Sequence, residues 1–256
     1  MFIPLHDANS LKYIKLQYVT FGLIAANVIV YLCTSLGTEN FHEATLIGFG
    51  YIPSVVFDIA ELPPEYAYVP KDFTYLTYSF LHGDIFHLGG NMLFLWVFGD
   101  NVEDALGHFR FLLFYLLCAV GGALAHGLIA PDSQSPLIGA SGAIAGVVAA
   151  YLILHPRVKI WVLAFARIPL RLPAYIVLAL WIVFQFLMFL AGGDDQISWA
   201  CHIGGIVTGA VLVLILKRRD QPVLDREIVT PRSVMIDQPS AVQPVDAQPA
   251  PRWGRQ

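Results

Sequence analysis

The chain has 256 residues, of which 57% are hydrophobic and 13% are charged, and its formal net charge is −4. Soluble domains average about 45–50% apolar and about 25% charged residues, so this composition excludes a disordered solvating chain, and its slight acidity excludes a basic nucleic-acid binder. The mean hydropathy is +0.63. Because the apolar residues stand in long runs, we predict a membrane protein that crosses the bilayer several times.

Six apolar runs approach the roughly 20 residues that a membrane-spanning helix needs. We treat the first as a retained helix because no cleavage-site pattern follows it. The predicted fold class is therefore all-α, a bundle of six transmembrane helices within residues 18–216, between an N-terminal segment (1–17) and a proline-rich tail (217–256) expected to be disordered. In chain order, the predicted helices are 18–36, 87–105, 109–130, 136–154, 172–191 and 197–216.

The distribution of basic residues predicts the orientation in the membrane. With the N-terminus in the cytoplasm, every Lys and Arg except Lys71 lies on the cytoplasmic side, as the positive-inside rule requires. Both termini are then cytoplasmic, and the long segment 37–86, rich in aromatic residues, is external and expected to pack against the bilayer interface. The basic and proline-rich tails favour a prokaryotic plasma membrane.

Four polar side chains stand inside the predicted spans, where each costs a few kcal/mol without a partner. His87 and Asn91 are four residues apart and share one face of the second helix. Ser141 lies near the start of the fourth helix, and His202 lies near the start of the sixth. All three helices enter from the external side, so these groups are expected at a similar depth.

Ser141 and His202 suit nucleophilic catalysis if the fourth and sixth helices touch. A serine hydroxyl needs a base within hydrogen-bond reach, and His202 is the available imidazole. Gly205 and Gly209 on the sixth helix, facing small residues such as Gly142 on the fourth, favour close packing in lipid. No Asp or Glu is predicted at this depth, so the sequence favours a Ser/His dyad over a triad.

An oxyanion formed beside Ser141 would need hydrogen-bond donors. The free amide groups at a helix N-terminus, the Asn91 amide and the His87 ring are suitable.

Each of these polar residues alone also has a structural interpretation, as part of helix packing or of an interhelical hydrogen bond, and His126 is interpreted as structural. Cys33, Cys118 and Cys201 are far apart and predict buried thiols. A metal site at His82, His87 and His202 is disfavoured because no acidic or thiolate partner accompanies them, and no cofactor is predicted.

Together, these residues resemble the rhomboid family of intramembrane serine proteases over about residues 10–218. The resemblance lies in four motifs: His82-x4-His87-x3-Asn91, Gly139-x-Ser141-Gly142, His202-x2-Gly205-x3-Gly209 and Gly99-x3-Glu103-x3-Gly107. It implies a six-helix core, Ser141 as nucleophile, His202 as general base, and Asn91, His87 and the Ser141 amide as oxyanion stabilisers. It also implies single-pass membrane proteins as substrates, cut in or near their spans, and a structural role for Glu103 in tying helix and loop together.

Two positions depart from the family pattern. Cys201 replaces a common alanine and is small enough to be tolerated. Ala145 stands where some members carry an aromatic residue that packs on the base, so Tyr151 or Trp199 is expected to orient His202 instead.

Two other functions remain open at the level of sequence. A catalytically inactive relative that binds and routes membrane clients should lack Ser141 or His202, and both are present. A transporter or channel should carry paired charges near mid-membrane or broken helices in matched halves. The predicted partners are the lipid bilayer and transmembrane proteins.

Overall fold

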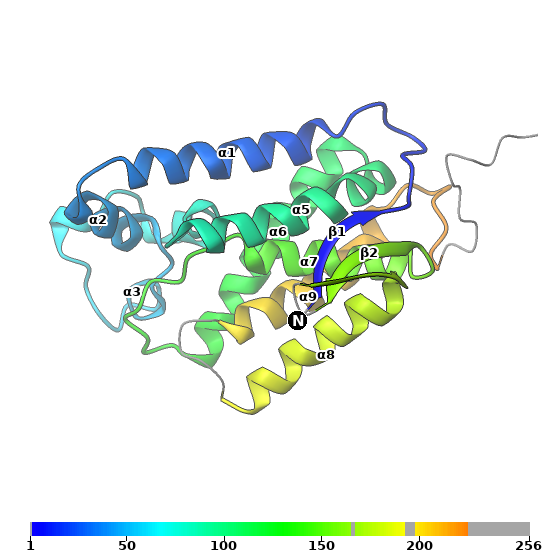
Figure 1. Cartoon of the computed structure of the whole chain (residues 1–256). Helices are drawn as coiled ribbons and strands as arrows, with labels where there is room; N and C mark the ends of the chain where they lie inside the picture. The colour runs from blue at the N-terminus through cyan, green and yellow to red at the C-terminus, as the bar shows by residue number, and fades with distance from the viewer. Residues whose placement is uncertain (1, 165–166, 193–197, 225–256) are drawn as a thin grey trace, which may run out of the picture.

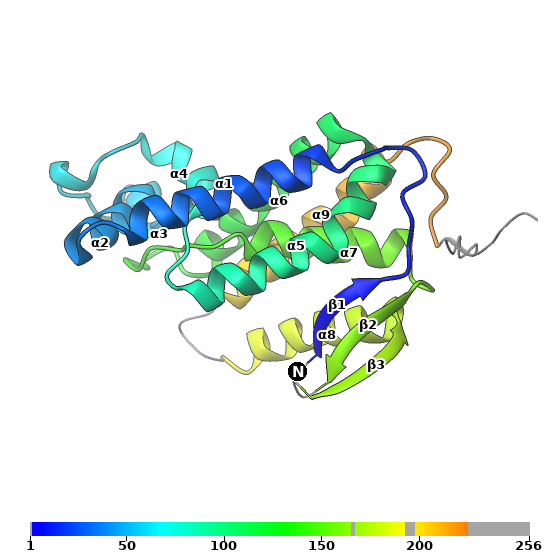
Figure 2. The same cartoon turned by 45° about the horizontal axis from the view of Figure 1, so that its top comes forward.

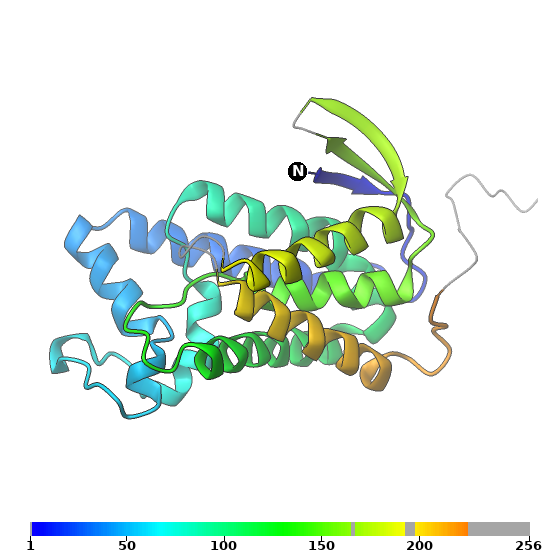
Figure 3. The same cartoon turned by 90° about the horizontal axis from the view of Figure 1, so that it is seen from below.

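Six long helices form the body of the molecule in the computed structural model, which describes residues 2–164, 167–192 and 198–224. Figures 1 and 3 show them side by side. The tail beyond residue 224, predicted to be disordered, lies outside the described residues. The helices are α1 (Tyr18–Ser35), α5 (Ile85–Leu106), α6 (His108–Ile129), α7 (Ser141–Leu154), α8 (Ala174–Leu190) and α9 (Trp199–Leu216).

Three of these helices, α1, α6 and α9, are long and apolar enough to cross a membrane by length and composition. Helices α7 and α8 are apolar but shorter. That the chain crosses the membrane six times therefore stays a prediction. Large apolar side chains point outward from the bundle. Such a surface suits contact with lipid and is unfavourable in water. Examples are Ile29, Phe109, Leu187, Leu190 and Ile215.

Between α1 and α5 the chain folds into short helices at one end of the bundle (Figures 1 and 2). This segment is anchored to the core by Tyr78, which is fully buried and donates from its hydroxyl to the Ala119 carbonyl at 2.7 Å. Its expected position at the bilayer interface stays a prediction. The short helices are α2 (Glu39–Phe49), α3 (Pro53–Val56), η1 (Pro64–Tyr66), η2 (Lys71–Phe73), α4 (Thr74–Thr77) and η3 (Tyr78–Phe80).

A three-stranded antiparallel sheet corrects the all-α prediction. Its order is β1 (Phe2–Asp7), β2 (Lys159–Ala164), β3 (Ile168–Pro173), with Ile3 opposite Leu163 and Ile160 opposite Leu172. Side chains of β2 are alternately exposed and buried over most of its length, the pattern of a strand with one face covered. Because residues 168–173 pair as β3, the helix predicted from residue 172 begins at Ala174.

The helix predicted over residues 136–154 is also shorter, and this changes the setting of Ser141. Residues 136–140 are not helical, because Tyr51 and Leu137 exchange two backbone hydrogen bonds of 3.1 and 2.8 Å. Gly139 then takes a positive φ of 112°, which glycine adopts without steric cost. Ser141 is consequently the first residue of α7 rather than a residue several positions inside it.

The sheet is tied to the helices by a buried acid. Asp7 at the end of β1 is 4% exposed, and the Tyr151 hydroxyl of α7 donates to its Oδ2 at 2.6 Å. Burial raises the pKa of Asp7 from 3.8 to about 6, against the opposing effects of Tyr151 and the neighbouring His6. Asp100 of α5 also interacts electrostatically with Asp7.

We expect the attachment of β1 to weaken as the pH rises from about 4 to about 6. In this range the folded state binds more protons at Asp7 than the unfolded state, so stability is greatest at the acidic end and falls until both states are ionised. Asn keeps an acceptor for Tyr151 without charge. Asp7→Asn should therefore remove the part of the pH dependence that is due to Asp7 and stabilise β1 at pH 8 by about 3 kcal/mol. Hydrogen-exchange protection factors of the amides of residues 3 and 5–7, measured at pH 5 and pH 8, test this. Equal protection of the wild type at both pH values would contradict it.

Candidate active site

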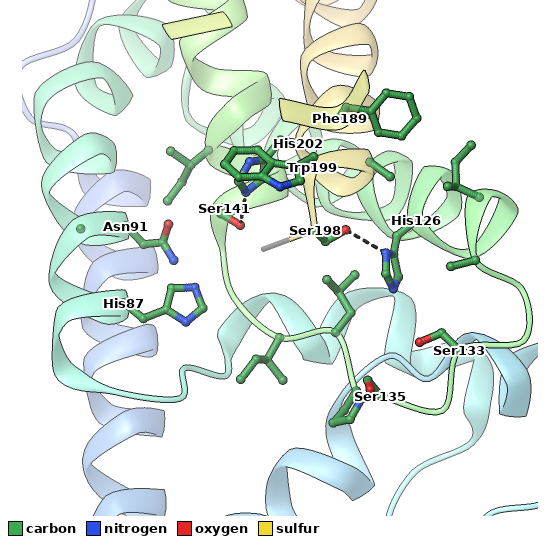
Figure 4. Close-up of a pocket in the computed structure, with 18 of the residues that line it drawn as sticks. His87, Asn91, His126, Ser133, Ser135, Ser141, Phe189, Ser198, Trp199 and His202 are labelled. Atoms are coloured by element: carbon green, nitrogen blue, oxygen red, sulfur yellow. Dashed lines mark hydrogen bonds between the residues drawn. The ribbon is translucent and has the colours of Figure 1, made fainter. Parts of the chain in front are cut away.

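Ser141 and His202 lie in direct hydrogen-bond contact although 61 residues separate them. His202 belongs to the first turns of α9, and its Nε2 lies 2.9 Å from Ser141 Oγ at the start of α7. Figure 4 shows the two side chains pointing toward each other at the edge of a cavity. The structure thus gives a serine hydroxyl an imidazole within the reach that nucleophilic catalysis needs.

The close crossing of α7 and α9 depends on glycine. A Cβ built on Gly205 would meet the Gly142 carbonyl oxygen at 1.9 Å, and one on Gly209 would meet the Gly146 carbonyl oxygen at 2.4 Å. No side chain fits at either point, so the two backbones are in contact. The small-residue spacing in the sequence indicated this contact, and it sets the distance between Ser141 and His202.

Gly205→Val should separate α7 from α9 and destabilise the protein by about 3 kcal/mol, because the added side chain overlaps backbone that cannot move away. Gly22→Ala is the matched control, since a Cβ there has nothing within 4 Å. Thermal unfolding in detergent should show a lower Tm for Gly205→Val and an unchanged or slightly higher Tm for Gly22→Ala. Equal Tm values for Gly205→Val and the wild type would refute the packing argument.

His87 and Asn91 face the same cavity from α5 (Figure 4). Asp84 caps this helix by accepting from the backbone amides of Phe86 and His87 at 2.7 and 2.9 Å. The cap fixes where α5 begins, and the spacing of four residues then places both polar side chains on the face toward Ser141.

His82 holds the Asn91 side chain in place. Its Nε2 lies 3.0 Å from Asn91 Nδ2, and it is 1% exposed. Burial lowers the pKa of His82 to about 4, so the imidazole is neutral near pH 7. An amide nitrogen only donates, so His82 accepts one Asn91 proton. The second proton of that amide stays available for another acceptor.

The turn before Ser141 brings backbone close to His87. A Cβ on Gly139 would lie 2.6 Å from His87 Nε2, and its φ of 112° already disfavours a side chain. Ala140, the N-cap of α7, has no side chain that can accept from the first amides of the helix. Such amides lack an intrahelical partner and carry the positive end of the helix dipole, so Ser141 stands where negative charge is stabilised.

The cavity that joins these groups has a volume of about 860 Å³. On its far wall His126 Nδ1 lies 2.8 Å from Ser198 Oγ, which also accepts from the Cys201 amide and caps α9. Figure 4 shows this pair across the cavity from Asn91. His126, interpreted from sequence as structural, therefore joins the end of α6 to the start of α9 and also lines the cavity.

Three groups surround the His202 ring. Trp181 lies 6.3 Å away at an interplanar angle of 30°, and Trp199 lies 5.9 Å away at 87°. Gln185 of α8 places its Oε1 2.7 Å from His202 Nδ1. Trp199 was expected near this ring, whereas the expectation for Tyr151 is wrong. Tyr151 is ten residues after Ser141, about 15 Å along the helix, and bonds to Asp7.

Sequence reasoning did not find Gln185, although a signal was present. It is an uncharged amide within the apolar run 172–191, and such a side chain needs a partner in lipid as much as a histidine does.

Comparison with known families decides the assignment. A model of the Rhomboid domain matches residues 71–219, more than half of the chain. The chain belongs to the rhomboid family. It is embedded in a membrane, as the apolar outer faces of its helices require. The matched region contains Ser141 and His202. It also contains His82, His87 and Asn91.

Relatives of this rhomboid occur in plants, fungi, animals and bacteria. Rhomboid-like protein 11, chloroplastic, of Arabidopsis thaliana is 27% identical over 192 residues, covering 72% of this chain and 67% of the relative. RHOMBOID-like protein 12, mitochondrial, from the same plant is 27% identical and covers 54% of this chain and 44% of its own length. Rhomboid protease GluP of Bacillus subtilis is 32% identical, with 52% of this chain and 24% of the relative covered. The chain thus spans less than half the length of two of these three relatives.

Glu103 of the rhomboid lies at the opposite end of α5 from His87. Its carboxylate accepts from the backbone amides of Val19 and Thr20 at 3.0 and 2.8 Å, and from the Thr20 hydroxyl at 2.7 Å. It also lies 2.5 Å from His108 Nδ1. Glu103 therefore ties the end of α5 to the first turns of α1 and α6, and acts away from the cavity.

The described part of the rhomboid chain contains no group of three or more His, Cys, Asp or Glu side chains arranged to hold a metal ion. The His82 and His87 rings lie 5.0 Å apart, and both are near the Asn91 side chain. The three cysteines are free thiols, with Cys33 exposed and the other two buried.

Proposed function

We propose that this rhomboid is an intramembrane serine endopeptidase that cuts single-pass transmembrane proteins in or near their spans. The observation that supports it most directly is the 2.9 Å contact between Ser141 Oγ and His202 Nε2 at the edge of a polar cavity. Family membership adds support, since relatives include Rhomboid protease GluP of Bacillus subtilis and Rhomboid-type serine protease 2 of Emericella nidulans.

In the proposed reaction, Ser141 Oγ attacks the carbonyl carbon of the scissile bond and its proton passes to His202 Nε2. His202 then gives that proton to the leaving amine nitrogen, and an acyl ester remains on Ser141. A water molecule activated by His202 hydrolyses the ester and frees the carboxyl product. During both steps the oxyanion accepts hydrogen bonds from the Ser141 amide, Asn91 Nδ2 and His87.

The proposed substrate class is supported by the chemistry of the peptide bond and by the position of the cavity. A peptide bond within a helix is hydrogen-bonded on both sides and must be unwound before attack, so spans with helix-destabilising residues are the expected substrates. The cavity lies at the starts of α5, α7 and α9, away from the sheet and from the basic residues Lys217, Arg218 and Arg219 that follow α9. By the positive-inside rule we propose that the cavity opens to the external side and that both termini are cytoplasmic.

The prokaryotic plasma membrane is retained only as a prediction. RHOMBOID-like protein 12 is named as mitochondrial and Rhomboid-like protein 11 as chloroplastic, while GluP is bacterial. Because two of these relatives belong to organelles, their names disfavour a prokaryotic plasma membrane predicted from the composition of the terminal segments alone.

The experiment is cleavage of a reporter substrate in proteoliposomes. The reporter has one span with Gly and Pro near its external end, and the fragments are identified by mass spectrometry. We expect two fragments with ends in or beside the span for the wild type, and none for Ser141→Ala. A folded wild type that binds the reporter without cutting it would instead support the client-binding function.

A further inference from the structure

The buried amide of Gln185 is a polar group within the apolar helix α8. The side chain is 2% exposed, and its neighbours in α8 are almost all aliphatic or aromatic. An amide buried without partners costs a few kcal/mol. Both ends of this amide are bonded: Oε1 lies 2.7 Å from His202 Nδ1, and Nε2 donates to the Trp181 carbonyl at 3.2 Å.

These two contacts define the protonation of the His202 ring. The Trp181 carbonyl only accepts, so it must face the amide nitrogen, and Oε1 of Gln185 must face the imidazole. Oε1 also only accepts, so the proton of the neutral imidazole lies on Nδ1. His202 Nε2 is then unprotonated and directed at Ser141 Oγ. This is the tautomer that a general base requires.

Other contacts of the ring do not supply this selection. Trp181 and Trp199 flank the imidazole at interplanar angles of 30° and 87°, but neither indole contributes a hydrogen-bond acceptor atom that would require the proton to be on Nδ1. Ser141 also gives no selection, because a hydroxyl both donates and accepts.

We propose that Gln185 is the positioning residue of the Ser141–His202 pair, holding His202 with its proton on Nδ1. The proposal rests on the proposed protease function for its kinetic consequence. The site is then a serine–histidine–glutamine arrangement, in which an uncharged amide orients the histidine as the carboxylate does in a catalytic triad. Because the amide carries no charge, it orients the imidazole without the Coulomb stabilisation of the imidazolium that a carboxylate provides.

Three variants separate positioning from packing. Gln185→Met keeps the length of the side chain and removes the acceptor, Gln185→Glu keeps the acceptor and adds charge, and Phe186→Leu is a control on a more exposed part of α8. With the reporter substrate, we expect Gln185→Met to lower kcat about 10- to 100-fold with little change in KM, since the ring loses both the orientation and the Nδ1-protonated tautomer that Gln185 holds. Gln185→Glu should keep kcat within about 5-fold at pH 8 and move the acid limb of the pH profile to higher pH. Phe186→Leu should match the wild type.

A second readout does not depend on proteolysis. In protein labelled with ¹⁵N-histidine, the ring nitrogen shifts of His202, assigned with His202→Ala, distinguish a protonated from an unprotonated nitrogen. We expect a protonated Nδ1 in the wild type and a mixture in Gln185→Met. An Nε2-protonated ring in the wild type, or equal kcat for Gln185→Met and the wild type, would overturn the proposal. If the wild type does not cleave, the protease function fails and the nitrogen shifts alone decide the role of Gln185.

Discussion

Replacing Ser141 with alanine is expected to lower kcat for the reporter substrate by about 10⁴-fold or more, and replacing His202 with alanine is expected to do nearly the same. In the proposed reaction the two groups act as one unit, because the hydroxyl is a weak nucleophile until Nε2 accepts its proton across 2.9 Å. The double variant should therefore be no slower than either single variant.

Single-turnover cleavage in proteoliposomes measures these rates, and detergent Tm values show whether the variants are folded. Additive losses in the double variant would contradict a coupled pair. A Ser141→Ala variant that retains a tenth or more of the wild-type rate would place the nucleophile elsewhere.

Gly139→Ala is expected to lower kcat by about 10²–10³-fold, the loss typical of one missing oxyanion donor. The new methyl group would lie 2.6 Å from His87 Nε2, in a backbone conformation of positive φ that alanine rarely adopts. The ring of His87 and the turn leading to Ser141 would both have to shift. The effect should fall on kcat more than on KM, because the displaced groups are the proposed oxyanion donors.

Gly89→Ala is the matched control for this variant. Gly89 lies on the same helix as His87, and a Cβ there meets nothing within 4 Å. Its kcat and KM should equal those of the wild type. A normal kcat for Gly139→Ala would show that His87 and this turn have no part in the transition state.

The sequence was informative about the site wherever a residue was out of place in an apolar run. Ser141, His202, His87 and Asn91 are costly in lipid, and the structure places them around one cavity. Gly205 indicated the crossing of α7 and α9, because glycine is favoured where two helix backbones touch in a membrane. Gln185 is an amide in an apolar run, as Asn91 is, and was not predicted although the same cost in lipid applies to it.

Features set by distant pairing were not predictable in the same way. The sheet depends on β1 meeting β2 across more than 150 residues, and neither strand alone differs clearly from the end of an apolar run. The start of α7 was misplaced because the Tyr51–Leu137 pairing, which keeps residues 136–140 out of the helix, is also distant in sequence. Local periodicity contains no information on either contact.

The central claim is that the Ser141 hydroxyl is activated by His202 within the folded bundle. Labelling with a fluorophosphonate, followed by mass spectrometry of the modified peptide, tests it most directly. The account predicts one adduct, on Ser141, formed by the wild type and lost in His202→Ala although Ser141 is still present. An adduct on another residue, or equal labelling of Ser141 in the wild type and in His202→Ala, would contradict it.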